Sequence, residues 1–284
     1  MKTPITPAPT RARTIVGAPG WRVSDEGGYL VATAGPDEIW VVDDVPGTIA
    51  AELAGCWSPE PPTPADLSPA ALLAVEQLRA IGVFGTPVML SPLALALRFA
   101  GTDSPDFRAA FAALCRMHGW RLFDHVDQPD GGRPSSVDVV TIVVRTTATL
   151  AATAQLTGEL VRAGDLHLLC DLSSAHTLAL GPFVAPGHSA CVGCLAGRVQ
   201  SRWGDPAPPS TPGAASGAGA QAAAGLLAHQ LRLAVEGRFP LVDACVSIDL
   251  DSLESGRSPC LRSAQCSLCG GIVTDGRLSL PWAR

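Results

Sequence analysis

The sequence predicts an α/β protein made of two units. Strand patterns at residues 21–23, 29–34 and 38–42 come first, and two helical patterns at 48–53 and 68–81 follow them. From residue 93 onward, strands alternate with helices, which is typical of a mostly parallel sheet. A length of 284 residues fits two domains of ordinary size. We therefore expect a small domain at residues 15–86 and an α/β domain at 87–284.

Turn and cap residues mark the elements of the N-terminal unit. Gly35-Pro36-Asp37 predicts a turn between the second and third strands. Ser68 and Pro69 indicate the start of a helix, because serine caps free amides and proline fits the first turn. Gly82 is a typical helix stop. The side chains that should face the core from this helix are Ala71, Ala74, Leu78 and Ile81.

The α/β unit is read from the same kind of signal. Strands are expected at 93–99, 120–123, 137–144, 166–170, 176–180 and 241–250, and helices at 104–117, 147–163 and 221–236. Residues 204–219 are rich in Pro, Gly, Ala and Ser, so they bury little apolar surface. We expect a mobile loop there.

Composition excludes several classes of protein. The net charge is −6 and Lys2 is the only lysine, which argues against binding nucleic acid, because phosphate neutralisation needs clustered basic residues. No apolar run reaches the length of about 18 residues that a membrane span requires. The N-terminus lacks the apolar core of a secretory signal, so we expect a cytoplasmic protein.

Four of the nine cysteines form two Cys-x-x-Cys pairs, which are Cys191 with Cys194 and Cys266 with Cys269. In a reducing compartment this pattern favours a metal site, and four thiolates suit tetrahedral zinc. Full cysteine coordination leaves no open position for water, so the predicted zinc is structural. Cys260 or His188 can replace one ligand in this interpretation. Redox use, or unrelated burial of the four, stays open.

A glycine-rich loop for phosphate is missing. The first strand of the α/β unit ends in Phe-Ala-Gly-Thr-Asp-Ser at 99–104, with a single glycine and the negative charge of Asp103. A nucleotide-binding turn needs a glycine-rich loop so that backbone amides can approach phosphate at a helix N-terminus, and here a negative charge lies where the phosphate would be. We therefore do not expect ATP binding.

Two resemblances cover most of the chain. The order of elements from residue 21 to 84, and especially Leu-Arg-Ala-Ile-Gly-Val-Phe at 78–84, resembles the PqqD-like precursor-peptide recognition element, a small winged-helix-like domain. From about residue 93 the chain resembles the ThiF-like, ubiquitin-activating-enzyme-like proteins of azole and thiopeptide biosynthesis. This second resemblance rests on Val-Asp-Val-Val at 137–140, Gly-Pro-Phe-Val-Ala-Pro-Gly-His-Ser-Ala-Cys-Val-Gly-Cys at 181–194 and Cys-Ser-Leu-Cys at 266–269.

The resemblance implies an adaptor without catalytic residues. Such proteins bind the leader of a ribosomally made peptide and present the peptide to a YcaO-type cyclodehydratase, which forms azolines with ATP. It implies a Rossmann-type α/β domain, carries over Cys191, Cys194, Cys266 and Cys269 as zinc ligands, and implies a homodimer. Adenylating relatives have an aspartate after the strand at 137–144, where this sequence has Arg145-Thr-Thr. The ThiF-like domain is therefore expected to be degenerate.

The leader is expected to add as an antiparallel strand to an exposed sheet edge at residues 38–42, beside the free face of the helix at 69–81. Arg79 should lie near an acidic leader residue. In an alternative placement, Ile39 and Val41 face the domain's own core while Trp40 and Val42 meet the peptide or solvent. The predicted surface comprises Glu38, Ile39, Trp40, Val41, Val42, Leu72, Val75, Glu76 and Arg79.

Two other functions remain open at this point. One is a true ThiF-like enzyme that adenylates a peptide with an unusual ATP site. The other is a winged-helix regulator that binds DNA, although the helix at 68–81 offers only Arg79 and Gln77 for base and phosphate contacts.

Overall fold

The structure is a computed structural model that describes residues 14–18, 20–85, 93–124, 139–272, 274 and 280. The chain divides into two compact units, one up to residue 89 and the other from residue 90. The expected domain boundary at residues 86 and 87 lies outside the described residues. Each unit is described by itself.

The N-terminal unit contains a three-stranded antiparallel sheet in the order β2-β3-β4. Its strands are β2 (Arg22–Glu26), β3 (Tyr29–Thr33) and β4 (Ile39–Pro46). Two short strands, β1 (Val16–Gly17) and β5 (Phe84–Gly85), pair antiparallel in a second sheet. The helical elements are α1 (Ile49–Ala54), α2 (Pro69–Ala80) and the 3-10 turns Gly55–Trp57 and Pro64–Asp66.

Local contacts fix the ends and the core of this unit. The Ser68 hydroxyl accepts a hydrogen bond from the Ala71 amide, which is the expected cap of α2. Gly17 lets the Trp57 ring approach the backbone, because a Cβ at Gly17 would lie 2.0 Å from the indole. The Trp57 indole donates to the Ala18 carbonyl. The largest fully buried side chains are Leu30, Leu53 and Leu78, and Phe84 is buried beside them in the same core.

The second unit is built on a seven-stranded mixed sheet in the order β12-β11-β10-β9-β8-β6-β7. The strands β7, β6, β8 and β9 are parallel to one another. Beyond β9, each successive pair, β9 with β10, β10 with β11 and β11 with β12, is antiparallel. The strand bounds are β6 (Ala94–Ala100), β7 (Arg121–Asp124), β8 (Val139–Arg145), β9 (His167–Asp171), β10 (Thr177–Val184), β11 (Ala244–Asp249) and β12 (Ser255–Pro259).

The expectation of a mostly parallel sheet is therefore wrong for three of the strands. Two short connections explain the direction of β10 against β9 and of β12 against β11, because a parallel neighbour needs a crossover of a dozen residues or more. Residues 172–176 join β9 to β10, and residues 250–254 join β11 to β12. Both strand pairs are antiparallel as a result.

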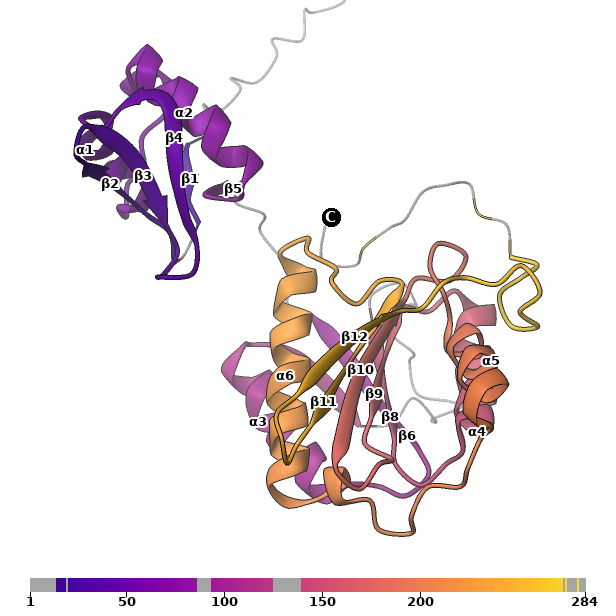
Figure 1. Cartoon of the computed structure of the whole chain (residues 1–284). Coiled ribbons are helices and arrows are strands. Elements are labelled where there is room, and N and C mark those ends of the chain that lie inside the picture. The colour runs from indigo at the N-terminus through magenta and orange to yellow at the C-terminus, as the bar shows by residue number, and fades with distance from the viewer. Residues whose placement is uncertain are drawn as a thin grey trace, which may run out of the picture. The chain divides into compact units, whose positions relative to one another are not determined.

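Helices cover both faces of this sheet (Figure 1). One layer holds α3 (Pro105–Met117) and α6 (Gly217–Val235), and the other holds α4 (Leu150–Ala163) and α5 (Val192–Trp203). Phe107 and Phe111 on α3 are fully buried in the core beneath the first layer of helices. Val143 on β8 and Leu169 on β9 are fully buried in the core beneath the second layer. None of the helices in the described ranges combines the length and the apolar content of a membrane span.

The low-complexity stretch 204–219 does not form one long loop. Residues Gly213–Ala215 make a 3-10 turn, and α6 begins at Gly217. The Ala214 side chain is fully buried in the core, and its amide bonds to the Ser174 carbonyl. Small side chains pack into this core under α6, so the composition that predicted a loop also permits an anchored turn.

Candidate functional site

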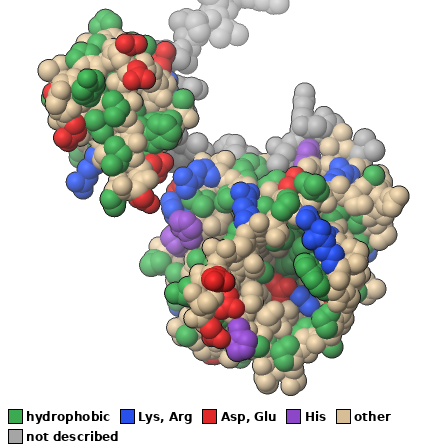
Figure 2. All heavy atoms as spheres, in the orientation of Figure 1, with side chains coloured by type: hydrophobic (Ala, Val, Ile, Leu, Met, Phe, Trp, Pro, Cys, Tyr) green, Lys and Arg blue, Asp and Glu red, His purple; other side chains and the backbone are tan. Residues whose placement is uncertain are grey.

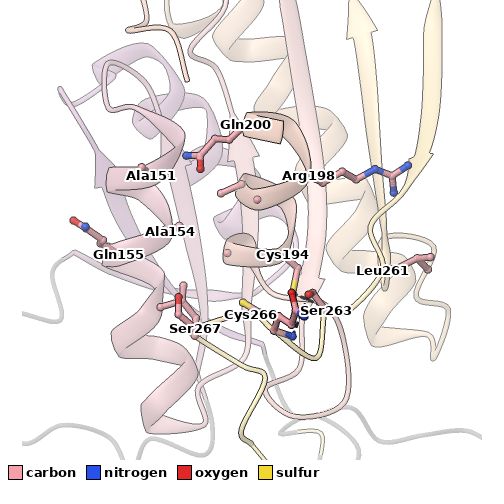
Figure 3. Close-up of a pocket in the computed structure, with 15 residues that line it drawn as sticks. Ala151, Ala154, Gln155, Cys194, Arg198, Gln200, Leu261, Ser263, Cys266 and Ser267 are labelled. Carbon is pink, nitrogen blue, oxygen red and sulfur yellow. Dashed lines mark hydrogen bonds between the residues drawn. The ribbon is translucent and has the colours of Figure 1, made fainter. Parts of the chain in front are cut away.

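The two Cys-x-x-Cys pairs, far apart in sequence, meet at one point in the second unit. Cys191 directly precedes α5 and Cys194 lies in its first turn, while Cys266 and Cys269 lie on turns that follow β12. The four sulfur atoms all lie within 4.8 Å of one another. Figure 3 shows Cys194 and Cys266 converging at the base of α5.

The spacing of the sulfurs fits a tetrahedral metal. A zinc ion with bonds of about 2.3 Å to each thiolate separates neighbouring sulfurs by roughly 3.8 Å. The Sγ atoms of Cys191 and Cys194 are 3.9 Å apart, those of Cys191 and Cys266 are 3.6 Å apart, and those of Cys194 and Cys269 are 3.4 Å apart. These four residues can therefore hold one zinc ion, with every coordination position filled by protein.

Gly193 and Gly270 lie in the two Cys-x-x-Cys turns at positions that leave no space for a side chain. A Cβ at Gly193 would lie 2.7 Å from the Leu268 side chain and 3.2 Å from the Cys266 sulfur. A Cβ at Gly270 would lie 2.4 Å from the Ala264 carbonyl. A side chain at Gly193 would push the two Cys-x-x-Cys turns apart, and one at Gly270 would distort the second turn itself, because contacts of 2.7 and 2.4 Å are shorter than real Cβ atoms make.

Arg262 ties the second cysteine turn to the rest of the unit. Its guanidinium donates to the carbonyls of Gly187, Cys269 and Ile272 at 2.6 to 2.8 Å. Three backbone segments are joined in this way by one planar group. These three hydrogen bonds hold the second cysteine turn in place without a contribution from a metal.

Burial disfavours an uncompensated negative charge on two thiols of this cluster, whereas desolvation of Cys266 is outweighed by hydrogen bonds from the Cys269 and Leu268 amides, which lower its pKa. Desolvation raises the pKa of the Cys191 thiol well above its usual range and raises the pKa of Cys269 to about 11. Four thiolates at this spacing would repel one another without a cation between them. A divalent metal supplies that cation, so the donor set and the burial agree with zinc.

The alternative ligands are not part of the cluster. Among the described residues, the group that can hold a metal consists of the two Cys-x-x-Cys pairs, without Cys260 and without His188. Cys260 is buried and interacts with Cys245 instead.

A second candidate site is the outer edge of β4. This strand pairs with β3 and, within the described residues, with no other strand. Ile39 and Val41 are 58% and 56% exposed, and Trp40 is 47% exposed. Large apolar side chains at such exposure on an edge strand mark a surface that binds another chain. Hydrophobic side chains reach the surface of this unit among acidic ones (Figure 2).

The main-chain groups of this edge can be assigned from the hairpin. The Ala34 amide donates to the Glu38 carbonyl at 2.9 Å, which places the hydrogen-bonded positions of β4 at Glu38, Trp40 and Val42. By alternation, the N–H and C=O groups of Ile39 and Val41 point to the free edge. Ile39 and Val41 thus present both main-chain groups and apolar side chains.

The residues predicted for this surface differ in how far their side chains are exposed. Val42 is 5% exposed and Val75 is 2% exposed, because both pack into the N-terminal core. Their side chains are therefore not part of this surface, and the alternative in which Ile39 and Val41 face the core is wrong as well. Leu72 is half-buried on α2 beside the core. The exposed members of the predicted set are Glu38, Ile39, Trp40, Val41, Glu76 and Arg79.

The carboxyl ends of β6 and β8 form the third place to examine, because open α/β sheets bind ligands where the strand order reverses. Here the two following loops bond to each other. The Thr102 amide donates to the Thr147 hydroxyl at 3.0 Å, and the Thr146 hydroxyl donates to the Thr102 carbonyl at 2.6 Å. A Cβ at Gly101 would lie 2.5 Å from the Thr147 nitrogen. The crevice between the loops is closed.

The helix N-terminus beside this crevice also has a partner. The Asp205 carboxylate accepts from the amides of Leu150 and Ala151, the first two residues of α4, at 2.9 and 2.8 Å. Arg145, at the end of β8, forms a half-buried ion pair with Asp171 at 2.7 Å. The Asp205 carboxylate therefore occupies the N-terminus of α4, whose free amides would otherwise be available to an anion.

Sequence reasoning missed Asp205, Asp171 and the pairing of Arg145. Arg145 was noted only as a replacement for an expected aspartate. Asp205 lies at the start of the low-complexity stretch 204–219, and its contacts with α4 are long-range, so no local pattern marks it. The signal that could have been used is the acidic residue itself, isolated among Pro, Ala and Ser.

Comparisons with known proteins place the fold. No protein-family model matches the sequence, and no curated protein matches it. A solved heterocyclase in complex with substrate and cofactor has a TM-score of 0.61 at 16% identity, over 91% of this chain and 40% of the heterocyclase. The heterocyclase TruD has a TM-score of 0.60 at 18% identity, over 90% of this chain and 43% of TruD.

A third neighbour matches along its whole length. E. coli MccB has a TM-score of 0.60 at 10% identity, over 94% of this chain and 99% of MccB. The chain thus has the mixed α/β, Rossmann-like fold of these proteins, with a cysteine cluster that suits a metal. It spans about two fifths of the length of the two heterocyclases.

Proposed function

We propose that this chain binds the leader segment of a ribosomally made precursor peptide and presents the peptide to a separate cyclodehydratase of the YcaO type. The single observation that carries the proposal is the exposed edge of β4, where Ile39 and Val41 combine outward main-chain groups with exposed apolar side chains. An extended peptide adds to such an edge through main-chain hydrogen bonds, and pockets for its side chains give selectivity. In this proposal the N-terminal unit is the PqqD-like recognition element.

The structural neighbours support a peptide as the ligand. Two of them are heterocyclases, one with its substrate, and MccB has been solved together with MccA. The heterocyclases are more than twice as long as the part that this chain matches. A partner chain that supplies the remaining part would explain how a protein of this length takes part in azoline formation. The product class, a thiopeptide or a related azole compound, rests on the sequence resemblance.

Adenylation of the peptide by this chain is the second candidate. MccB, which has also been solved with ATP, favours it. Against it stand the closed loops after β6 and β8 and the Asp205 carboxylate on the N-terminus of α4. We therefore propose a non-catalytic adaptor with one structural zinc per chain. A homodimer is part of this proposal, and light scattering across micromolar concentrations should give twice the mass of one chain. A monomer mass throughout would remove it.

The leader site can be tested at Val41, whose amide points to the free edge. Val41→Pro removes that donor, and an edge strand tolerates proline. Leader affinity, measured by fluorescence anisotropy, should fall by about 1 to 3 kcal/mol, or roughly fivefold to 150-fold, since a peptide carbonyl loses its partner. The probe is the N-terminal half of the short Cys/Ser-rich peptide encoded nearest to this gene.

Val41→Ala is the matched control, because it keeps the amide and shortens only the side chain. It should weaken the leader less than proline does. Unchanged affinity in a folded Val41→Pro variant would refute this placement of the site.

A further inference from the structure

A groove of about 630 Å³ lies between α4, α5 and the second cysteine turn. Figure 3 shows Ala151, Ala154 and Gln155 on α4, with the α5 side chains opposite them and Ser263, Cys266 and Ser267 at its base. The volume is in the range of ordinary ligand sites. Cys194 and Cys266 of the zinc cluster lie in its lining, whereas no residue of β4 does.

Its walls suit a peptide backbone. Ala151 and Ala154 on α4, with Gly193, Ala196 and Gly197 on α5, leave room for a main chain to come close. A Cβ at Gly197 would meet nothing within 4 Å, so this helix surface opens directly into free space. Small residues on facing helices therefore shape the groove.

Its polar groups point to the same ligand. The lining includes Gln155, Gln200, Gln265, Ser263 and Ser267, whose side chains end in amide or hydroxyl groups, and the Gln200 amide also donates to Asp205. Each of these groups can donate and accept hydrogen bonds, as a main-chain amide requires of its partner. Apart from the metal-ligand cysteines Cys194 and Cys266 at its base, Arg198 is the one charged residue of the lining. One cation among amides and hydroxyls is a poor match for a polyphosphate, which needs several donors with positive charge.

Arg198 indicates where a charge on the ligand would lie. Its guanidinium donates to the Pro259 carbonyl, and it reaches from α5 toward the segment that holds Leu261 (Figure 3). A guanidinium has five N–H donors. The contact with Pro259 fixes its direction and leaves donors for a carboxylate.

We propose that the groove holds an extended, carboxylate-bearing segment of the precursor peptide that follows the leader. This proposal rests on the proposed function, because the leader brings the peptide to the chain. The second contact is then intramolecular, and a shallow, open groove suffices at the effective concentration that the leader provides. The groove would select a second part of the same peptide, independent of the edge of β4.

The test compares two labelled probes, which are the full-length peptide encoded nearest to this gene and its leader half alone. With the wild-type chain, the full-length peptide should bind at least about tenfold more tightly than the leader. Gly197→Leu fills the groove and should remove this gain while leaving the leader affinity unchanged. Its Tm should not fall, because leucine replaces glycine in a helix with open space beside it.

Gly225→Leu is the matched control. Gly225 is also a helical glycine whose Cβ would meet nothing within 4 Å, but it lies on α6, on the opposite face of the sheet. This variant should keep the full gain. Arg198→Gln should reduce the gain partly. Replacing the acidic residues that follow the leader with amides should reduce the gain equally in the wild-type chain. The same peptide change should have no additional effect in the Arg198→Gln variant.

The outcomes separate the two proposals. If the leader alone does not bind the wild-type chain, the proposed function fails. If the leader binds and the full-length peptide binds no more tightly, the groove proposal is overturned and the leader site stands. A gain that survives Gly197→Leu, or that Gly225→Leu also abolishes, overturns it too.

Discussion

The carboxyl ends of β6 and β8 and the outer edge of β4 are both places where this chain could bind a ligand through its backbone. At the first, the amides of Thr102, Leu150 and Ala151 have partners within the protein. At the second, the main-chain groups of Ile39 and Val41 point outward beside exposed apolar side chains. A backbone group binds a ligand only when the fold leaves it without a partner.

The two regions differ in whether their backbone groups are already bonded within the protein. A Rossmann-like sheet binds nucleotides through the first βα loop and the helix N-terminus that follows it. Here Thr146 and Thr147 bond to that loop at Thr102, and Asp205 caps the neighbouring helix α4. A site with backbone groups directed outward beside exposed apolar side chains lies in the N-terminal unit, at the outer edge of β4. The predictions below alter one region at a time and ask whether the other region responds.

The largest effect is expected from the zinc cluster. Cys194→Ser should release the metal and lower the free energy of unfolding of the second unit by several kcal/mol, because metal binding at such sites is also folding free energy. Zinc per chain, measured by atomic emission, should fall from one to below one half. Leader affinity should stay close to wild type if the N-terminal unit folds independently.

Cys260→Ser is the control for this change. Cys260 is buried nearby but is not a member of the metal group. It should keep one zinc per chain. Loss of zinc in this variant and retention in Cys194→Ser would show that the ligand set is wrong.

A smaller loss is expected at the closed crevice. Gly101 has φ of 108° and no room for a Cβ beside Thr147. Gly101→Ala should cost about 1 to 3 kcal/mol of unfolding free energy in urea titrations. Gly119→Ala, at φ of 68° with nothing within 4 Å, carries the backbone cost alone and should lose less. Equal losses would mean that the crevice is not tightly closed.

Asp205 should contribute less again, with a pH dependence of defined sign. Partial desolvation acts to raise the pKa of Asp205, but the amides of Ala151 and Leu150 and the Gln200 side chain lower it below its usual value. The carboxylate therefore stabilises the fold at neutral pH, and this contribution is lost as pH falls through the lowered pKa. Asp205→Ala should cost about 0.5 to 2 kcal/mol at pH 7.

Unfolding titrations from pH 7 down to pH 3 check this prediction. The difference between wild type and Asp205→Ala should shrink as the pH falls. A difference that stays constant, or grows, would contradict the role of the carboxylate as a cap for α4.

Local signals account for the elements that the sequence predicted. The cap at Ser68 and Pro69, the strands of the parallel part and both Cys-x-x-Cys turns were predicted from neighbours in sequence, and the structure contains them. Helix α5 was not predicted, although Val192, Leu195, Ala196 and Val199 have helical spacing. β12 was missed because Ser-Gly-Arg-Ser-Pro has weak strand propensity.

The remaining errors involve contacts between distant parts of the chain. Val75 was assigned to a free face by helical spacing, but the packing of α2 against its own unit buries it. The cap that Asp205 provides to α4 spans 55 positions, and the groove beside α5 is assembled from three separate segments. Such features depend on tertiary packing, which periodicity does not encode.

The most direct test of the central claim, that the chain binds a peptide without activating it, is ATP–pyrophosphate exchange in the presence of saturating full-length precursor peptide. The closed loops after β6 and β8 and the Asp205 carboxylate predict exchange at background level in a sample whose leader binding is confirmed by anisotropy. Exchange above background that requires this chain and no other protein would contradict the account.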